Sequence, residues 1–82
     1  MHRTSERFRE CFRRLPDHVR ARAIKKFELL KSNPRYPSLR FKKVGLFWSV
    51  RIDSSYRALA LEDGKDFLWF WIGIHADYDS FI

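Results

Sequence analysis

The 82-residue chain has few cysteines and no long apolar stretch, and each of these shortages excludes a class of proteins to which it could belong. Cys11 is its one cysteine, so an intramolecular disulfide is impossible, and a reducing cytoplasm is the expected compartment. Charged residues follow Met1, which argues against a secretory signal. The longest apolar stretch, residues 67–74, is too short to cross a bilayer as a helix. We therefore expect no membrane anchor.

Motifs of metal and nucleotide chemistry are also lacking. The sequence contains no glycine-rich phosphate loop, no CxxC pair and no HExxH, and His2, His18 and His75 fall in separate predicted elements. We therefore expect neither a metal site nor a cofactor. Cys11 falls on the apolar side of a predicted helix, where a structural thiol is expected rather than a nucleophile.

The chain does have the material for one small folded domain. Its length suits a single modest core, and we expect residues 1–82 to form one domain. Hydrophobic residues make up 45% of the chain and aromatic residues 17%, which is ample for that core.

Positive charge is plentiful and unevenly spread, within a formal net charge of +7. Residues 1–43 hold fourteen Lys and Arg against four Asp and Glu, a net of +10, whereas residues 44–82 hold three against six, a net of −3. A field of this sign attracts phosphate-bearing partners. Solvated helix faces that aid solubility are the alternative, but the sequence pI of about 10.1 favours nucleic acid.

Helical periodicity dominates the first half of the chain. Apolar residues recur every three or four positions in two adjoining segments, 5–15 and 16–31. The two apolar stripes consist of Phe8, Cys11, Phe12 and Leu15, then Val19, Ala23, Phe27 and Leu30, flanked by Ile24. Pro16 suits a helix start, and Pro34 ends the second helix because it pushes the preceding residue out of the α region. We expect a helical hairpin.

From residue 39 the period changes to two, which is typical of strands. A short strand or arm is expected at Leu39–Lys43, followed by three stronger strands at Phe47–Ile52, Tyr56–Leu61 and Phe67–Ile74. The predicted fold class is α+β, with the N-terminal helical hairpin packed on a small twisted antiparallel sheet. Strict alternation would put Trp69 and Trp71 on one face, as core or as a stacking platform, with core favoured.

Basic residues recur along these strands and at their ends. In an antiparallel meander the end of one strand lies near the start of the next, so Arg51 and Arg57 are expected to approach across the turn at residues 53–55. The third strand ends at the same edge, which would add His75. Arg40, Lys42 and Lys43 precede the first strong strand.

A site of this composition suits RNA cleavage, in which the 2′-hydroxyl attacks the neighbouring phosphate. Arg57 and Arg51 would stabilise charge on the phosphoryl oxygens through their forked donors. His75 would move a proton near neutral pH. We predict catalytic roles for these three residues, and RNA-binding roles for Arg40, Lys42, Lys43 and Tyr78, the last by stacking on a base.

Each of these residues also has a purely structural interpretation. His75 could be bonded to backbone at a strand end, and Arg57 could pair with Asp53 or Asp63. Lys42 and Lys43 could protect a sheet edge from aggregation. Tyr78 could pack the chain terminus. The hypothesis of a nuclease site depends on their combination.

The order of these segments resembles one known family, the RelE/ParE superfamily of toxins. The string WSVRIDSSYRALALEDGKDFLWFWIGIHADYD resembles that family's sheet, with closest likeness to the YoeB-type toxins. LPDHVRARAIKKFELLKSNPRYPSLRFKKV resembles its second helix and the following arm. The resemblance covers nearly the whole chain from about Ser5.

This resemblance implies a RelE-like fold and a toxin of a type II toxin–antitoxin system, acting as a ribosome-dependent mRNA endonuclease that inhibits translation. Its partners would be an antitoxin protein, the ribosome and mRNA. Arg57 matches the family's phosphate-stabilising arginine and His75 its acid/base histidine, while Lys42, Lys43 and Arg51 fall where relatives place basic residues that contact RNA. Tyr78 is a looser match.

Two departures from the family pattern stand out. The family opens with a short strand, which only Met1–Thr4 could supply here, and the YoeB-type glutamate has no counterpart near Pro37, so a general base is missing. Two alternatives remain open: a ParE-type, non-catalytic DNA gyrase inhibitor and a non-toxic basic nucleic-acid-binding domain. His75 argues against the gyrase inhibitor, because that branch lacks the histidine and its cations.

Overall fold

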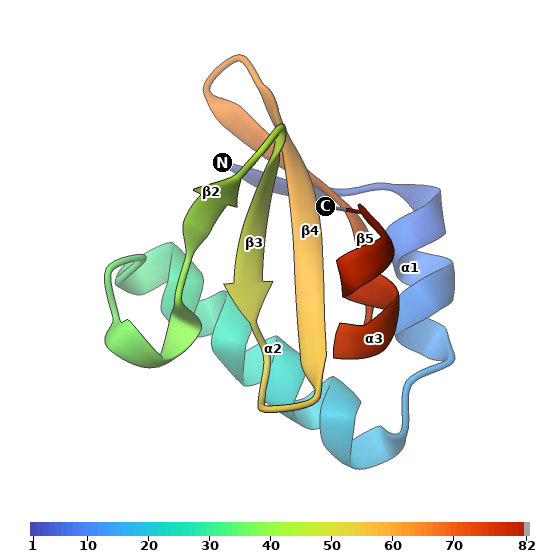
Figure 1. The fold of residues 1–82 in the computed structure, drawn as a ribbon. Coiled ribbons are helices and arrows are strands. Elements are labelled where there is room, and N and C mark those ends of the chain that lie inside the picture. The colour runs from blue at the N-terminus through green and yellow to red at the C-terminus, as the bar shows by residue number, and fades with distance from the viewer. Residues whose placement is uncertain (82) are drawn as a thin grey trace.

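The computed structural model describes residues 1–81 of the chain (Figure 1). Its helices and strands are β1 (His2–Thr4), α1 (Glu6–Arg13), α2 (Asp17–Ser32), β2 (Lys42–Val44), β3 (Phe47–Arg51), β4 (Tyr56–Asp63), β5 (Asp66–Ile74) and α3 (His75–Tyr78). Two 3₁₀ turns, Pro37–Leu39 and Asp79–Phe81, precede β2 and follow α3. The helical hairpin and the three strong strands agree with the prediction.

The sheet has five strands in the order β1-β5-β4-β3-β2. Strands β3 to β5 form the predicted antiparallel meander, and β2 adds to it antiparallel beside β3. Strand β1 runs parallel to β5, so the sheet is mixed rather than wholly antiparallel. The short opening segment thus forms the first strand that the resemblance in sequence implies. The three residues of β1 are too few for their alternation of polar and apolar side chains to predict a strand. Their backbone pairing with β5 places them in the sheet.

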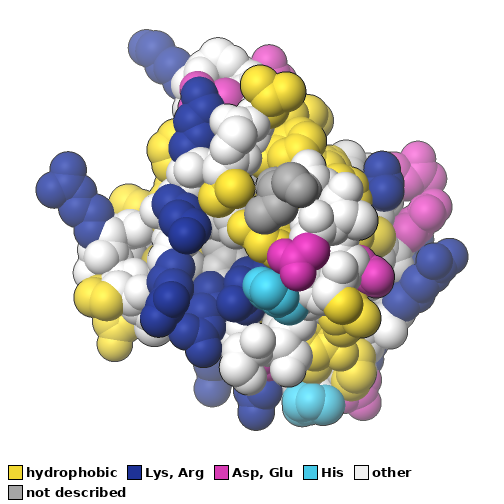
Figure 2. Space-filling model, in the orientation of Figure 1, with side chains coloured by type: hydrophobic (Ala, Val, Ile, Leu, Met, Phe, Trp, Pro, Cys, Tyr) yellow, Lys and Arg dark blue, Asp and Glu magenta, His cyan; other side chains and the backbone are white. Residues whose placement is uncertain are grey.

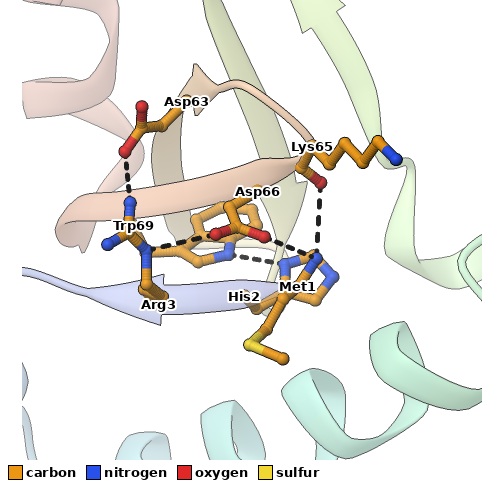
Figure 3. A network of polar contacts seen from close by, with 7 residues as sticks. All are labelled: Met1, His2, Arg3, Asp63, Lys65, Asp66 and Trp69. Carbon is orange, nitrogen blue, oxygen red and sulfur yellow. Dashed lines mark hydrogen bonds and ion pairs between the residues drawn. The ribbon is translucent and has the colours of Figure 1, made fainter.

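Polar contacts fasten β1 beside β5 (Figure 3). The Trp69 indole Nε1 donates to His2 Nδ1 at 2.9 Å. Arg3 pairs with Asp63 and, at 3.6 Å, with Asp66. These contacts tie the first strand to both arms of the β4–β5 hairpin.

Helices α1 and α2 cover one face of the sheet and close the main core. In Figure 1, α2 crosses behind the strands, with α1 at the β5 side. Five residues of the predicted apolar stripes are buried: Phe8, Val19, Ala23 and Leu30 in the helices, and Leu15 in the link between them. They belong to the same core as the sheet residues Val50, Ile52, Ala58, Ala60, Trp69 and Ile72, and the other stripe residues, Cys11, Phe12 and Phe27, are partly buried against it. Ser5 caps α1 by accepting the amide of Phe8 at 3.1 Å. Within residues 1–81, no helix has the length and apolarity needed to cross a membrane.

A bulge in β5 separates the two tryptophans that were predicted to share a face. Leu59 pairs with Trp71 and Ala60 with Trp69, so Phe70 is an extra residue in β5. Trp69 therefore points into the main core, whereas Trp71 joins a second cluster on the opposite face. Both indoles are buried, and the prediction of a shared face was wrong because the bulge shifts the alternation.

The second face of the sheet is only partly covered. There α3 and the turn after it pack Tyr78 and Phe81 against Leu59 and Trp71. Figure 1 shows α3 in front of the strands, on the side opposite α2. Beside this cover, a pocket over β2, the end of β3 and the start of β4 opens to solvent and holds the candidate site.

Candidate functional site

A pocket of about 200 Å³ lies on the open face of the sheet, beside α3. Its lining consists of Arg40, Lys42, Ser49, Arg51, Arg57, His75 and Tyr78. Figure 2 shows the Lys and Arg side chains gathered over β2 and the lower parts of β3 and β4, next to a histidine. The pocket thus brings together six of the seven predicted site residues from four separate parts of the chain.

Strand register puts two arginines directly opposite each other. Arg51 of β3 pairs with Arg57 of β4, and alternation adds Ser49 to the same face. Ser49 is the one buried polar side chain among residues 1–81, at 4% exposure. The pocket floor is therefore a hydroxyl beside two guanidinium groups.

Arg57 is held by backbone carbonyls rather than by a carboxylate. Its Nη1 donates to the carbonyl oxygen of Asp53 and, at 3.0 Å, to that of Tyr56. Burial lowers the pKa of Arg57, and the positive charges of Arg51 and Arg40 lower it further. The predicted alternative of an ion pair is wrong, because Asp53 pairs with Arg22 and Asp63 pairs with Arg3. Within residues 1–81, Nη2 and Nε of Arg57 donate no hydrogen bond, since both bonds of this side chain come from Nη1.

His75 is fixed at the start of α3. Its backbone amide donates to the carbonyl of Ser55 at 2.7 Å, which joins the end of β5 to the β3–β4 turn. The side chain is 47% exposed, and its Nδ1 lies 3.7 Å from an oxygen of Asp79. The Asp79 carboxylate therefore lies beside Nδ1, on the opposite side of the ring from Nε2. The ring of Tyr78 lies 5.4 Å from that of His75.

Comparison of the sequence with known protein families shows to which family the chain belongs. The family model described as the ParE-like toxin domain matches residues 17–80. The chain belongs to this family. No curated protein matches the chain significantly in sequence.

Solved structures of toxins share the fold of this ParE-like domain. A chain of the RelB–RelE antitoxin–toxin complex from Methanococcus jannaschii superposes with a TM-score of 0.74 at 20% identity, covering 98% of this chain and 99% of that one. YafQ from Escherichia coli gives 0.73 at 12% identity, with 95% and 96% covered. The YoeB/ParE toxin from Agrobacterium tumefaciens gives 0.68 at 12%, with 90% and 96% covered. The α+β, RelE-like architecture is thereby confirmed.

Lys43 is the predicted site residue that the ParE-like toxin does not bring to the pocket. Lys42 pairs with Ser49, whereas Lys43 pairs with Trp48, whose side chain packs against the main core on the helix-covered face. Lys43 therefore points to the other side of β2. Its sequence position gave no indication of this, because the register of β2 on β3 decides it.

Sequence reasoning also missed three polar residues around the pocket. Ser49 lies on its floor, Asp79 lies beside the imidazole, and Asp53 organises the turn that holds Arg57. The spacing of His75 and Asp79, four residues apart, was a usable signal once a helix was expected there. Tyr78 lines the pocket but is only 7% exposed, so both its predicted roles, packing and contact with a ligand, remain available to it.

Proposed function

We propose that this toxin is a metal-independent endoribonuclease that cleaves messenger RNA on the ribosome in the cytoplasm and so inhibits translation. The observation that carries the proposal is the convergence of Arg51, Arg57 and His75 on one open pocket. Within residues 1–81, no three His, Cys, Asp or Glu side chains group closely enough to hold a metal ion. In this proposal, the side chains that line the pocket supply charge stabilisation and proton transfer.

The reaction would use the RNA's own 2′-hydroxyl as nucleophile. A bond forms between O2′ and phosphorus while the bond from phosphorus to O5′ breaks, which leaves a 2′,3′-cyclic phosphate and a 5′-hydroxyl. Arg57, with Arg51 opposite, binds the phosphoryl oxygens on which charge builds. His75 protonates the departing O5′, and solvent water takes the proton of the 2′-hydroxyl.

Lys42 and Arg40 would hold the RNA backbone at the rim of the same pocket. Within residues 1–81, neither cation forms an ion pair with a carboxylate. Phosphate contacts of this kind give affinity without sequence selection. Tyr78, beside His75, would contact a base or ribose at the reacting nucleotide.

The test measures cleavage of a defined mRNA on programmed ribosomes. Arg57→Ala and His75→Ala should each reduce the cleavage rate at least about a hundredfold, because they remove a transition-state contact or the general acid. Lys43→Ala, on the other face of β2, is the matched control and should cleave normally. Full activity in both pocket variants would refute the mechanism.

A second candidate function is the non-catalytic inhibition of DNA gyrase, and the family description ParE-like is the observation that favours it. A gyrase inhibitor needs no acid/base histidine, so His75→Ala should leave its effect intact. Supercoiling assays with purified gyrase, run beside the ribosome assay, separate the two functions. A basic domain without toxicity would affect neither.

We also propose a cognate antitoxin as the protein partner. Similar chains occur in antitoxin–toxin complexes from Methanococcus jannaschii and Mycobacterium tuberculosis. An acidic antitoxin segment would complement the cationic pocket and cover it. Co-expression with the product of a short adjacent reading frame should relieve growth arrest, and the purified pair should co-elute.

A further inference from the structure

The turn between β3 and β4 touches both side chains on which the proposed chemistry depends. The carbonyl of Asp53 accepts from the Arg57 guanidinium, and the carbonyl of Ser55 accepts the backbone amide of His75 at 2.7 Å. This one short turn therefore fixes the orientation of the Arg57 guanidinium and the position at which α3, the helix that carries His75, begins.

The Asp53 carboxylate holds this turn in shape. Its Oδ1 accepts the backbone amides of Ser55 at 2.8 Å and Tyr56 at 2.9 Å. Its Oδ2 lies 2.9 Å from Nη1 of Arg22, which reaches across from α2. Only 19% of the Asp53 side chain is exposed to solvent, and both of its carboxylate oxygens have partners within the protein.

These partners keep Asp53 ionised near neutral pH. Burial by itself raises the pKa of Asp53, but the amide of Ser55 and the guanidinium of Arg22 more than offset it, so the pKa lies below its ordinary value. The turn is thus held by a charged acceptor throughout the range in which the toxin would act.

From this geometry we propose that Asp53 is a positioning residue of the RNA-cleaving site, which fixes the β3–β4 turn and thereby sets the Arg57 guanidinium and the His75 end of α3. The inference rests on the proposed ribonuclease function. Asp53 itself touches no substrate, since its oxygens are occupied by the turn and by Arg22. Asp53 contributes by orienting Arg57 and His75, because small displacements of such groups have large effects on the rate of the catalysed reaction.

Two substitutions at Asp53 separate the acceptor from the charge. Asp53→Ala removes both, whereas Asp53→Asn retains an oxygen that can accept the amides of Ser55 and Tyr56 and loses only the ion pair with Arg22. Asp63→Ala is the matched control, because Asp63 also belongs to a β-hairpin and pairs with an arginine, Arg3, but at the opposite end of β4.

Steady-state cleavage on ribosomes should then show a split between kcat and KM. Asp53→Ala should lower kcat about 10- to 100-fold with KM changed less than about threefold, because the cations that bind RNA remain. Asp53→Asn should restore kcat to within about threefold of the wild type. Asp63→Ala should lose stability without losing kcat. Equal damage from the Asn and Ala variants, or loss of kcat in Asp63→Ala, would overturn the proposal.

A double-mutant cycle tests whether Asp53 acts through Arg57. If it does, Asp53→Ala should reduce activity by a smaller factor in the Arg57→Ala background than in the wild type, because one of the two residues that it positions is gone and only the effect through His75 remains. A purely structural role would instead reduce activity by the same factor in both backgrounds, and that result would contradict the inference.

A measurement without RNA keeps this inference separate from the proposed function. In nuclear magnetic resonance spectra, the Arg57 Nε–H signal and the His75 ring signals should shift or broaden in Asp53→Ala and remain near wild-type positions in Asp53→Asn and Asp63→Ala. A wild type that cleaves no RNA would refute the ribonuclease, while unchanged Arg57 and His75 signals in Asp53→Ala would refute the positioning role.

Discussion

At the scale of single residues, the pocket contains two arginines whose positive charges repel each other, and this repulsion contributes nothing to the stability of the fold. Arg51 and Arg57 are direct cross-strand partners, and like charges in that arrangement cost roughly 0.2–1 kcal/mol. The lowered pKa of Arg57, due first to burial and then to Arg51, reflects the same crowding of charge. A phosphate group bound between the two guanidinium groups would attract both and offset this repulsion, and we therefore attribute the pair to the proposed RNA ligand rather than to packing.

Neighbouring lysines of β2 offer a matched test of the binding face. Lys42 lines the pocket and Lys43 points to the opposite face. Lys42→Ala should therefore weaken RNA binding by about 1 kcal/mol, roughly fivefold in Kd, while Lys43→Ala leaves it unchanged. Fluorescence anisotropy with a short single-stranded RNA measures both, and equal losses would show that the RNA does not follow the pocket.

Arg40 carries a backbone cost at the rim of the pocket. It adopts the left-handed conformation, with φ of 46°, immediately after the 3₁₀ turn Pro37–Leu39. A non-glycine residue there is strained by about 1 kcal/mol or more. Under the proposed function, this strain would be retained because the Arg40 side chain is needed at the pocket that Arg57 also lines.

Two substitutions at Arg40 separate strain from function. Arg40→Gly and Arg40→Ala both remove the guanidinium and should weaken RNA binding equally. Arg40→Gly should unfold with a free energy about 0.5–1 kcal/mol higher than Arg40→Ala, since only glycine adopts this conformation without strain. Urea denaturation followed by circular dichroism measures the difference. Equal stability of the two variants would show that the backbone there is relaxed.

The residue types of the site could be predicted from sequence, but their faces could not. Arg51, Arg57 and His75 were recognisable as strand-end groups with the right chemistry. The orientation of Lys43 depended on how β2 is registered on β3, and the turn geometry that occupies Asp53 depended on three-dimensional partners such as Arg22. A shift of register by one residue exchanges the faces of a strand, and the sequence carries no local signal for it.

At the scale of elements, the attachment of β1 contains a pH-sensitive hydrogen bond. His2 Nδ1 accepts from the Trp69 indole, which requires a neutral imidazole (Figure 3). Burial lowers the pKa of His2 below 6.5, with further lowering by the N-terminal ammonium and Lys31. The folded state thus prefers the neutral ring, so this stability is complete above about pH 6.5 and is lost as the pH falls toward the lowered pKa.

His2→Gln should remove that part of the pH dependence, because the amide side chain does not titrate. The difference in unfolding free energy between wild type and His2→Gln should shrink or reverse as the pH falls from 7 to about 5. His18→Gln makes the same substitution at an exposed position of α2, away from β1, and is the control. Parallel stability curves for wild type and His2→Gln would contradict the role assigned to His2.

Long elements were predictable and short ones were not. Proline at positions 16 and 34 marked the limits of α2, and alternation located β3 to β5. Strand β1 has three residues and is ordered by pairing with β5, while the bulge at Phe70 inserts one residue without a glycine or turn signal. Both features arise from contacts distant in sequence, which local periodicity does not contain.

At the scale of the whole molecule, the net charge of +7 permits two kinds of RNA binding. RNA could bind over the basic helices generally, as a non-toxic basic domain would bind it, or it could bind at the pocket alone. The pocket offers four lysines and arginines, Arg40, Lys42, Arg51 and Arg57. Each phosphate neutralised on a single strand contributes about −0.7 to the slope of log affinity against log salt.

Binding at the pocket therefore predicts a slope of about −3, whereas binding over the basic surface generally, with many more cations engaged, predicts a much steeper one. Titrations of a short single-stranded RNA at several potassium chloride concentrations measure this slope. Lys42→Ala should make it shallower by about 0.7, and Lys25→Ala, at an exposed position of α2, should not alter it. A steep slope that responds equally to both variants would show that the charge acts diffusely, and that the pocket is not where the RNA is held.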